Sequence, residues 1–380
     1  MLIGRNSKYN ILFIAAFCVM SQVVMALVQI AIIDIYNIDE TTATQYRVWL
    51  AAIPMILAFF IVFPEKKRLW ITTYIIALFI MLIHTIFFPS NEQFIWGEGT
   101  RFTLPIVLAS ALVVISISDV NLIERAMYIV SWLAFFVAVI YFLNLILGRF
   151  VIENYNMGFS YSLLLPILTL YKKKCWYSVI AAAGLLIGII FIGSRGAVII
   201  SGIYIFVDII AFNRTSKLWG IMVFAMILFL IPLLELFMGT IGISSRTLQL
   251  IYDSELLSHD SGRGDLYEIA YSLILQHPIT GVGIFGDRVY CPPYVHSFIY
   301  ELWLNWGIIL GSFFCILYLF KFLSVFFKSS FYDREILLRY FCAGVAPLFV
   351  SSSYLISLSF GIYTGILVVF AAKVKVKYIS

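Results

Sequence analysis

The stretch FIGSRGAVII, residues 191–200, places a single arginine between two long apolar runs. An ionised side chain inside hydrocarbon costs about 2.5 kcal/mol or more, so an unpaired Arg195 deep in a bilayer would be hard to retain. The cost falls sharply if the two runs are separate helices that meet at the membrane surface. We therefore interpret GSRG, residues 193–196, as a turn between two membrane-spanning helices.

The composition extends this interpretation to the whole chain. Of the 380 residues, 63% are hydrophobic and only 12% are charged, with a mean hydropathy of +1.02. Apolar runs of about 17 to 25 residues recur, and each can cross a bilayer as a helix. We predict an all-α, polytopic membrane protein with about twelve transmembrane helices, forming a single integral membrane domain over 1–380. The predicted spans are 11–33, 48–63, 69–88, 102–118, 124–147, 158–171, 175–192, 196–212, 218–237, 296–320, 336–351 and 354–372.

Lysine and arginine indicate the orientation, because positive residues are retained on the cytoplasmic side. All twelve lysines fall in every second connection or at the ends, whereas the opposite connections carry arginine as their only basic residue. We therefore predict that both termini are cytoplasmic. The net charge of +5 is spread over separate inner loops, so it does not indicate a nucleic-acid partner.

The longest connection is a predicted outer loop at 238–295, between the ninth and tenth spans, which we expect to contain short helices. Its segment SGRGDLYEIAYSLILQHP, residues 261–278, has polar residues at helical spacing and predicts an amphipathic helix at the membrane interface. Asp260 or Ser261 can cap this helix, and Pro278 ends it.

Two further motifs follow in this loop. TGVGIFGD, residues 280–287, contains G-x-G-x-x-G, but without a preceding strand or a following crossover helix it does not indicate a dinucleotide site. It favours a tight turn that returns the loop to the membrane. In CPPYVHSFIYELWLNWGIILG, residues 291–311, the prolines place the start of the next span just after them, with His296 in its first turn. His296, Tyr300 and Trp303 are then expected on one face.

Arg195, Arg263 and Arg288 lie close to three outward helix N-termini, where a positive charge is unfavourable. An anion among them would resolve the conflict, and a lipid diphosphate suits the outer surface. The same surroundings favour a neutral His296, the form that accepts a proton.

Other interpretations of these residues stay open. Arg195 can pair with an outer carboxylate or a lipid phosphate, Arg263 with Asp260 or Asp265, and Arg288 with Asp287. His296 can serve as an interfacial cap or anchor, and His277 as support for the helix end. His, Cys and carboxylates do not occur at metal-ligand spacing, so we predict no metal site and no cofactor.

The order of the motifs resembles one family. SRG lies between two spans, SGR precedes a helix ending in HP, GVG-x-x-G follows, and HS-x-x-x-E-L-x-x-x-x-G-I-I-x-G opens the next span. This pattern over about 193–311 resembles the O-antigen ligase and O-antigen polymerase superfamily. Ser297 departs from it, since asparagine is common after the histidine.

The resemblance implies a metal-independent, inverting glycosyltransferase of the bacterial inner membrane with its active site on the periplasmic side. Its donor would be an undecaprenyl-diphosphate-linked oligosaccharide. By motif, Arg195 and Arg263 match the arginines that engage the diphosphate, and His296 matches the candidate base. Glu301 matches an acidic position, to which we add Tyr300 and His277 as supporting residues and Arg288 as a further diphosphate ligand.

We expect a polymerase, which transfers the glycan to another lipid-linked repeat unit. The alternative is a ligase that transfers it to lipid A-core, and a more distant one is a twelve-span transporter or flippase. Membrane lipid, a chain-length regulator and a flippase of the same pathway are the other expected partners.

Overall fold

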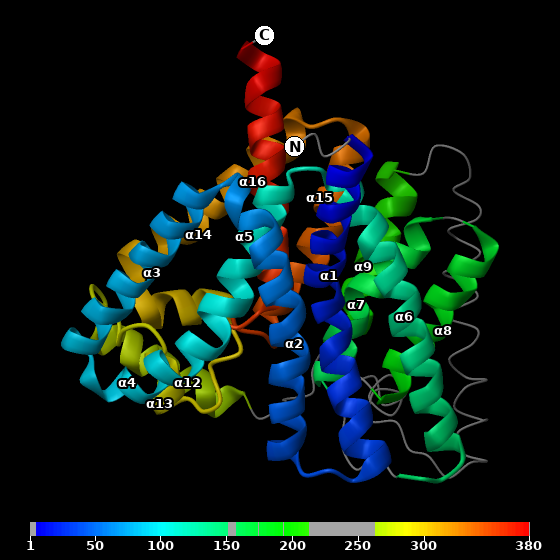
Figure 1. Ribbon diagram of the computed structural model, residues 1–380. Helices are drawn as coiled ribbons and strands as arrows, with labels where there is room; N and C mark the ends of the chain where they lie inside the picture. Colours follow the sequence, from blue (N-terminus) through cyan, green and yellow to red (C-terminus); the bar gives the residue numbers. More distant parts are fainter. Residues whose placement is uncertain (1–4, 151–156, 174, 193, 213–262, 380) are drawn as a thin grey trace. The chain divides into compact units, whose positions relative to one another are not determined.

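The computed structural model describes residues 5–150, 157–173, 175–192, 194–212 and 263–379. These residues form helices without any strand, which confirms the all-α class for the described part of the chain (Figure 1). The α-helices are α1 (Arg5–Tyr36), α2 (Glu40–Val62), α3 (Lys67–Phe87), α4 (Glu92–Phe94), α5 (Ala109–Ile117), α6 (Val120–Ile146), α7 (Met157–Lys172), α8 (Trp176–Ile192), α9 (Arg195–Val207), α12 (Gly264–Gln276), α13 (Gly286–Tyr290), α14 (Phe298–Lys328), α15 (Phe331–Gly344) and α16 (Leu358–Ile379). Short 3₁₀ segments are η1 (Phe63–Glu65), η2 (Pro89–Asn91) and η5 (Ala346–Phe349), and π-helical segments are η3 (Ile95–Leu108) and η4 (Asp208–Phe212).

Seven helical segments of the described residues are long and apolar enough to cross a bilayer, so the chain is a multi-pass membrane protein. They are Ser7–Tyr36, Val48–Glu65, Lys67–Phe87, Pro89–Ile117, Val120–Ile146, Phe298–Lys328 and Leu358–Val376. Each overlaps one of the predicted spans.

The remaining predicted spans have different outcomes. Two correspond to the shorter apolar helices Trp176–Ile190 and Gly196–Phe212. The span predicted at 158–171 is α7, with 16 residues and an internal proline, and the one at 218–237 lies outside the described residues. The span predicted at 336–351 corresponds to α15, a helix of 14 residues, or roughly 21 Å. The chain leaves the α-helix at Gly344, and the resulting helix is too short to cross hydrocarbon.

The chain forms two compact units. The first comprises 1–19, 52–123 and 260–380, and the second 20–51 and 124–259. In the first unit, α16 packs against α5 and α15. Gly361 and Gly365, spaced as in small-xxx-small contacts of membrane helices, face α5 and the segment before it. A Cβ on Gly361 would lie 2.4 Å from the carbonyl oxygen of Val107, so the glycine permits this close approach.

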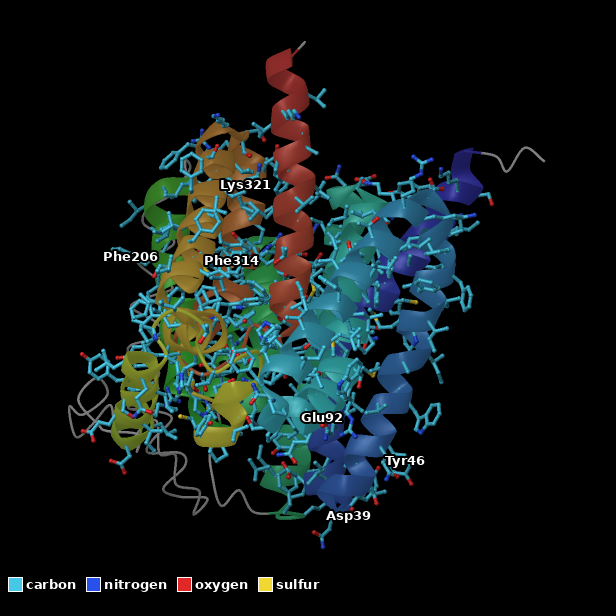
Figure 2. The ribbon with its side chains drawn as sticks, turned by 90° about the vertical axis from the view of Figure 1, so that its left-hand side faces the viewer. Asp39, Tyr46, Glu92, Phe206, Phe314 and Lys321 are labelled. Carbon is cyan, nitrogen blue, oxygen red and sulfur yellow. The ribbon has the colours of Figure 1, made fainter. Side chains whose placement is uncertain are left out.

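The two ends of the first unit differ in charge. At one end, Lys66 Nζ donates to the carbonyl oxygen of Ile115, at the end of α5, and Lys373 of α16 pairs with Asp333 of α15 at 2.7 Å. Figure 2 shows Lys321 of α14 toward this end and Glu92 toward the opposite end. The predicted site residues of this unit lie at the opposite end, where α12, α13 and the start of α14 gather.

In the second unit, α7 packs against α8 and α9. Tyr141 of α6 donates to the Asp34 carboxylate of α1 over 2.5 Å, which gives this carboxylate a hydrogen-bond donor among apolar helices. On α8, a Cβ at Gly188 would lie 2.4 Å from the Phe142 ring of α6, so the absence of a side chain allows the ring to sit there. These contacts tie the ends of α1, α6 and α8 into one helical unit.

Candidate functional site

The site is built on a break in α14. Gly307 has φ 75° and ψ 168°, which interrupts the helix between Trp306 and Ile308. A broken helix leaves backbone groups without partners. Here the preceding loop supplies them, because Val282 N–H donates to the Leu304 carbonyl at 2.6 Å and Ile308 N–H donates to the Pro278 carbonyl at 2.8 Å. The loop therefore completes the hydrogen bonding of the broken helix.

Glycines allow this contact, as the G-x-G-x-x-G motif predicted. Gly281 and Gly283 have φ values of +65° and +86°, which side chains rarely adopt. A Cβ on Gly307 would lie 2.1 Å from the carbonyl oxygen of Ile279, and one on Gly281 would lie 2.3 Å from that of Leu304. The prediction of a tight turn is confirmed, and its partner is the interrupted helix.

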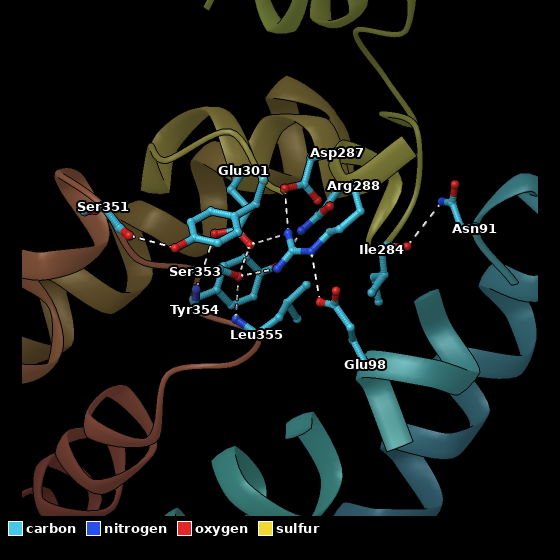
Figure 3. A network of polar contacts seen from close by, with 12 residues as sticks. Asn91, Glu98, Ile284, Asp287, Arg288, Glu301, Ser351, Ser353, Tyr354 and Leu355 are labelled. Atoms are coloured by element: carbon cyan, nitrogen blue, oxygen red, sulfur yellow. Dashed lines mark hydrogen bonds and ion pairs between the residues drawn. The ribbon is translucent and has the colours of Figure 1, made fainter. Parts of the chain in front are cut away.

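The other side of the turn is held by the end of α3 and by η2. Asn91, which is fully buried, donates from Nδ2 to the carbonyl oxygens of Val282 at 2.8 Å and Ile284 at 3.2 Å. Figure 3 shows the bond to Ile284. His84 Nδ1 accepts the Ile284 N–H at 2.9 Å. The turn is thus fixed from two directions, and α13 begins directly after it at Gly286.

Arg288 of α13 occupies the centre of a buried polar network (Figure 3). Its Nη1 lies 2.5 Å from Asp287 Oδ2 and 3.1 Å from Glu301 Oε1, and its Nε lies 3.3 Å from Glu98 Oε2. Its Nη2 donates to Ser353 Oγ over 2.7 Å. The side chains of Arg288 and Glu301 are each 1% exposed, so the charge is buried and neutralised within the protein.

These contacts occupy Arg288 within the protein, and its predicted role as a diphosphate ligand stays a prediction. Each of its three guanidinium nitrogens already contacts a carboxylate or a hydroxyl, and almost no surface of the side chain is accessible. The alternative, a pair with Asp287, is the one that the structure shows. Glu301 supports the site by holding Arg288.

The network also organises the segment 350–354, between η5 and α16. Glu301 accepts the Ser353 hydroxyl at Oε1 and the Tyr354 N–H, over 3.3 Å, at Oε2. Upstream in the same segment, Arg263 donates from Nη1 to the Val350 carbonyl. The Tyr294 hydroxyl donates to the Ser351 carbonyl over 2.9 Å. Residues that are far apart in sequence therefore contact four of the five positions in this segment.

His296 lies beside this segment, but not where the sequence predicted. The helix begins at Phe298 with Ser297 as its N-cap, so His296 precedes the helix and is not in its first turn. Its φ is 54°, a left-handed conformation that is uncommon for a residue other than glycine. The imidazole packs against the Tyr294 ring in a tilted arrangement, with centroids 4.2 Å apart.

The environment keeps His296 neutral. Burial, and then the positive charges of Arg263 and Arg288, lower its pKa to about 4, although a hydrogen bond with the Ser351 backbone acts in the opposite direction. The side chain is 8% exposed, and Nδ1 has no hydrogen-bond partner among the described residues. Arg263 and His296 are thus close enough to interact, and the neutral imidazole has a buried nitrogen available to a bound molecule.

Tyr300 belongs to a different cluster. Its ring packs against Tyr267 of α12, with centroids 5.5 Å apart, and against Trp303, at 6.1 Å. Because His296 lies outside the helix, the expected common face of His296, Tyr300 and Trp303 is wrong. His277 is the C-cap of α12, which confirms the helix end before Pro278.

The start of α12 differs from the prediction. The N-cap position is Arg263, without a side-chain hydrogen bond to the helix, so Asp260 and Ser261 do not occupy it. Both lie outside the described residues, as does the outer loop as far as 262. Asp265, one of the predicted partners, forms no ion pair with Arg263 in the described structure, where that guanidinium contacts the neutral Val350 carbonyl.

Arg195 is the first residue of α9, in the second unit. The Ser194 side chain caps this helix by accepting the Gly196 N–H over 3.3 Å, and the Ser194 N–H donates to Ser160 Oγ over 2.7 Å. The predicted turn at the start of a helix is confirmed. The role of Arg195 toward a diphosphate stays a prediction.

Sequence reasoning missed most of the polar partners. Glu98, Ser353 and Asn91 contact residues 65 to 193 positions away. No local pattern marks them, apart from the occurrence of polar residues close to the ends of apolar runs.

Comparison with known proteins agrees with the resemblance found from the motifs. Residues 180–315 match a family model described as O-antigen ligase. This region includes the Arg195 turn, α12, α13 and the first part of α14. A comparison with curated proteins finds no match.

Proposed function

We propose that this protein is an inverting glycan polymerase, on the basis of the match of residues 180–315 to a family model described as O-antigen ligase. It transfers a glycan from undecaprenyl diphosphate to a sugar hydroxyl of another lipid-linked repeat unit, on the periplasmic face of the inner membrane. The observation that carries the proposal is the approach of Arg263 to a buried, neutral His296 at the end of the unit opposite to the lysines. With the lysines in the cytoplasm, this site faces outward.

The reaction needs an acceptor for a proton and a stabilised leaving group. His296 removes the proton from the acceptor hydroxyl while its oxygen forms a bond to the anomeric carbon of the donor. The bond from that carbon to the diphosphate oxygen breaks with inversion, and the electron pair leaves on undecaprenyl diphosphate. Arg263 stabilises this charge, and Arg195 is proposed for the same role from its motif alone, so no metal ion takes part in the proposed reaction.

A pKa of about 4 makes His296 a weak base in the free protein. Binding of the proposed substrate should raise this low pKa in part. A diphosphate beside Arg263 counters one of the charges that lower the pKa, so the basicity of the imidazole rises when the donor is bound. Proton transfer is then favoured only in the complex with substrate.

A second candidate is a ligase, which the description of the matching family favours. It uses the same donor and the same residues but transfers the glycan to lipid A-core. A transporter is less well supported, although the break in α14 is a feature found in transporters. At this break, the Leu304 carbonyl and the Ile308 N–H both form hydrogen bonds with the loop, so groups of the protein itself pair with them.

The test is lipopolysaccharide electrophoresis of a deletion strain complemented with variants. A lost polymerase leaves core with one repeat unit, whereas a lost ligase leaves bare core and accumulated lipid-linked polymer. His296→Ala, Arg263→Ala and Arg195→Ala should each abolish long chains while the protein still inserts, and Lys321→Ala at the opposite end serves as control. Full ladders from all three variants would reject the site.

A flippase and a chain-length regulator of the same pathway are the proposed partners, and their deletion should change the supply of repeat units or the length of the ladder.

A further inference from the structure

Tyr294 connects the buried arginine to the proposed base. It lies between α13 and α14, two residues before His296, and is half-buried. Its ring centroid is 4.2 Å from that of the imidazole, with an angle of 50° between the planes. On the same ring, the Arg288 guanidinium carbon lies 5.4 Å from the centroid. One aromatic ring therefore contacts both the central cation and the histidine.

The hydroxyl of Tyr294 adds a second attachment. It donates to the Ser351 carbonyl over 2.9 Å, and the backbone of Ser351 also hydrogen-bonds with the imidazole of His296. Ser351 lies two residues before Ser353, whose hydroxyl connects Arg288 and Glu301. The tyrosine and the histidine thus share one backbone anchor, and the buried network fixes that anchor.

His296 needs such an anchor because helix geometry does not determine its conformation. The residue precedes the N-cap and has a left-handed backbone. A conformation of this kind is strained and persists only when its surroundings enforce it. Val295, the residue before it, is fully buried, and its backbone hydrogen-bonds with the Asp287 carboxylate. This contact fixes the main chain but leaves the direction of the imidazole to its own neighbours.

We infer that Tyr294 is a positioning residue for His296. Its ring and its bond to Ser351 hold the imidazole toward the acceptor hydroxyl, and the ring covers the imidazole from water. This inference rests on the proposed function, in which His296 is the base. The ring and the hydroxyl contribute separately, so two substitutions separate their effects.

Tyr294→Phe removes the bond to Ser351 and keeps the ring. We expect kcat to fall about fivefold, the scale of one neutral hydrogen bond, with little change in KM. Tyr294→Leu also removes the ring, and we expect kcat to fall about a hundredfold, as for a displaced catalytic group. Loss of the ring also exposes the imidazole to water. Because burial is the largest cause of the low pKa, the pKa of His296 should then rise toward its ordinary value near 6.5.

The experiment uses the full chain in lipid nanodiscs, labelled with ¹⁵N-histidine, and does not depend on activity. A pH titration of the imidazole signals gives the pKa of His296, which is assigned by its loss in His296→Gln. The charged groups next to this imidazole, Arg263 and Arg288, are left unchanged, so a shift reports the ring. Tyr290→Leu and Tyr290→Phe are the matched controls, because Tyr290 of α13 is 43% exposed. Turnover of lipid-linked donor is measured on the same samples.

The inference predicts a raised pKa of His296 in Tyr294→Leu, an unchanged one in Tyr290→Leu, and the stepwise losses in kcat. If Tyr294→Leu does not fold, Tyr294→Phe decides through kcat and KM alone. Wild-type kcat in Tyr294→Phe, or a histidine titration in Tyr294→Leu identical to that of Tyr290→Leu, overturns the inference. Failure of the proposed function looks different: the wild type would then show no turnover of the donor, or His296→Gln would retain full turnover, whatever Tyr294 does to the pKa.

Discussion

The most informative perturbation of the fold around the site is Arg288→Met. Methionine keeps an unbranched apolar chain but removes the guanidinium. Asp287 and Glu301, whose side chains are 0% and 1% exposed, then lose their shared cation. Removing one partner of a buried ion pair costs about 3–5 kcal/mol, because the remaining charge is left unpaired. Glu98 adds little, since its side chain is 33% exposed and can regain water.

The free energy of unfolding can be measured by denaturant titration in mixed micelles, followed by tryptophan fluorescence. We expect Arg288→Met to lose about 3–5 kcal/mol and Glu98→Gln less than about 1 kcal/mol. Lys321→Met, at an exposed position, should match the wild type. In the double variant Arg288→Met with Glu301→Gln, the total loss should be smaller than the sum of the single losses, because the second change removes the unpaired charge.

A loss below about 1 kcal/mol in Arg288→Met would refute this account of the network. The same variant separates two roles of the arginine. A residue that binds diphosphate would raise KM for the donor while stability stays near that of the wild type. A residue that holds the site together lowers stability first, and the protein loses activity as the segment 350–354 moves.

Three further predictions follow from single contacts. Gly307→Ala should lower the free energy of unfolding by more than about 3 kcal/mol, because a Cβ would lie 2.1 Å from the Ile279 carbonyl oxygen. The same denaturant titration measures this loss, and wild-type stability would contradict the role of the break. Asn91→Leu should cost about 2–4 kcal/mol by leaving two buried carbonyls of the glycine turn unpaired, and a neutral result would show that the turn holds without it. In the pH dependence of turnover, kcat/KM should decline only as the pH approaches about 4, because burial and Arg263 lower the pKa of His296 in the free protein. The acid limb of kcat should lie at higher pH, since the bound diphosphate counters Arg263, and a kcat/KM limb near 6.5 would contradict the neutral, buried imidazole.

The features that the sequence predicts correctly depend on local signals. Long apolar runs predict the membrane spans, Pro278 predicts the end of α12, and two glycines predict the turn. The start of α14 was placed two residues too early, which is a normal error for a helix end. That small error removes His296 from the helix, and it separates His296 from the face that carries Tyr300.

The polar network could not be predicted in the same way. Arg288 is next to Asp287 in sequence, which suggests an exposed pair in a loop. Its burial depends on Glu98 and Ser353, at sequence separations of 190 and 65, and on the turn that carries α13 into the protein. Similarly, an apolar run predicts helix α15 but not its early end. Long-range packing decides these features, and a periodic pattern contains no information about it.

Arg263 and Arg288, the two candidate site arginines in the first unit, have different surroundings. Arg288 is buried and paired with carboxylates, so its charge holds the network together. Arg263 is partly buried and donates to the neutral carbonyl of Val350, so its positive charge stays uncompensated by any carboxylate of the described structure. An uncompensated cation near a helix start is unfavourable without an anion. The positive charge of Arg263 also lowers the pKa of His296. An anion that binds Arg263 therefore neutralises the cation at the helix start, and it raises the basicity of His296 when a donor is present.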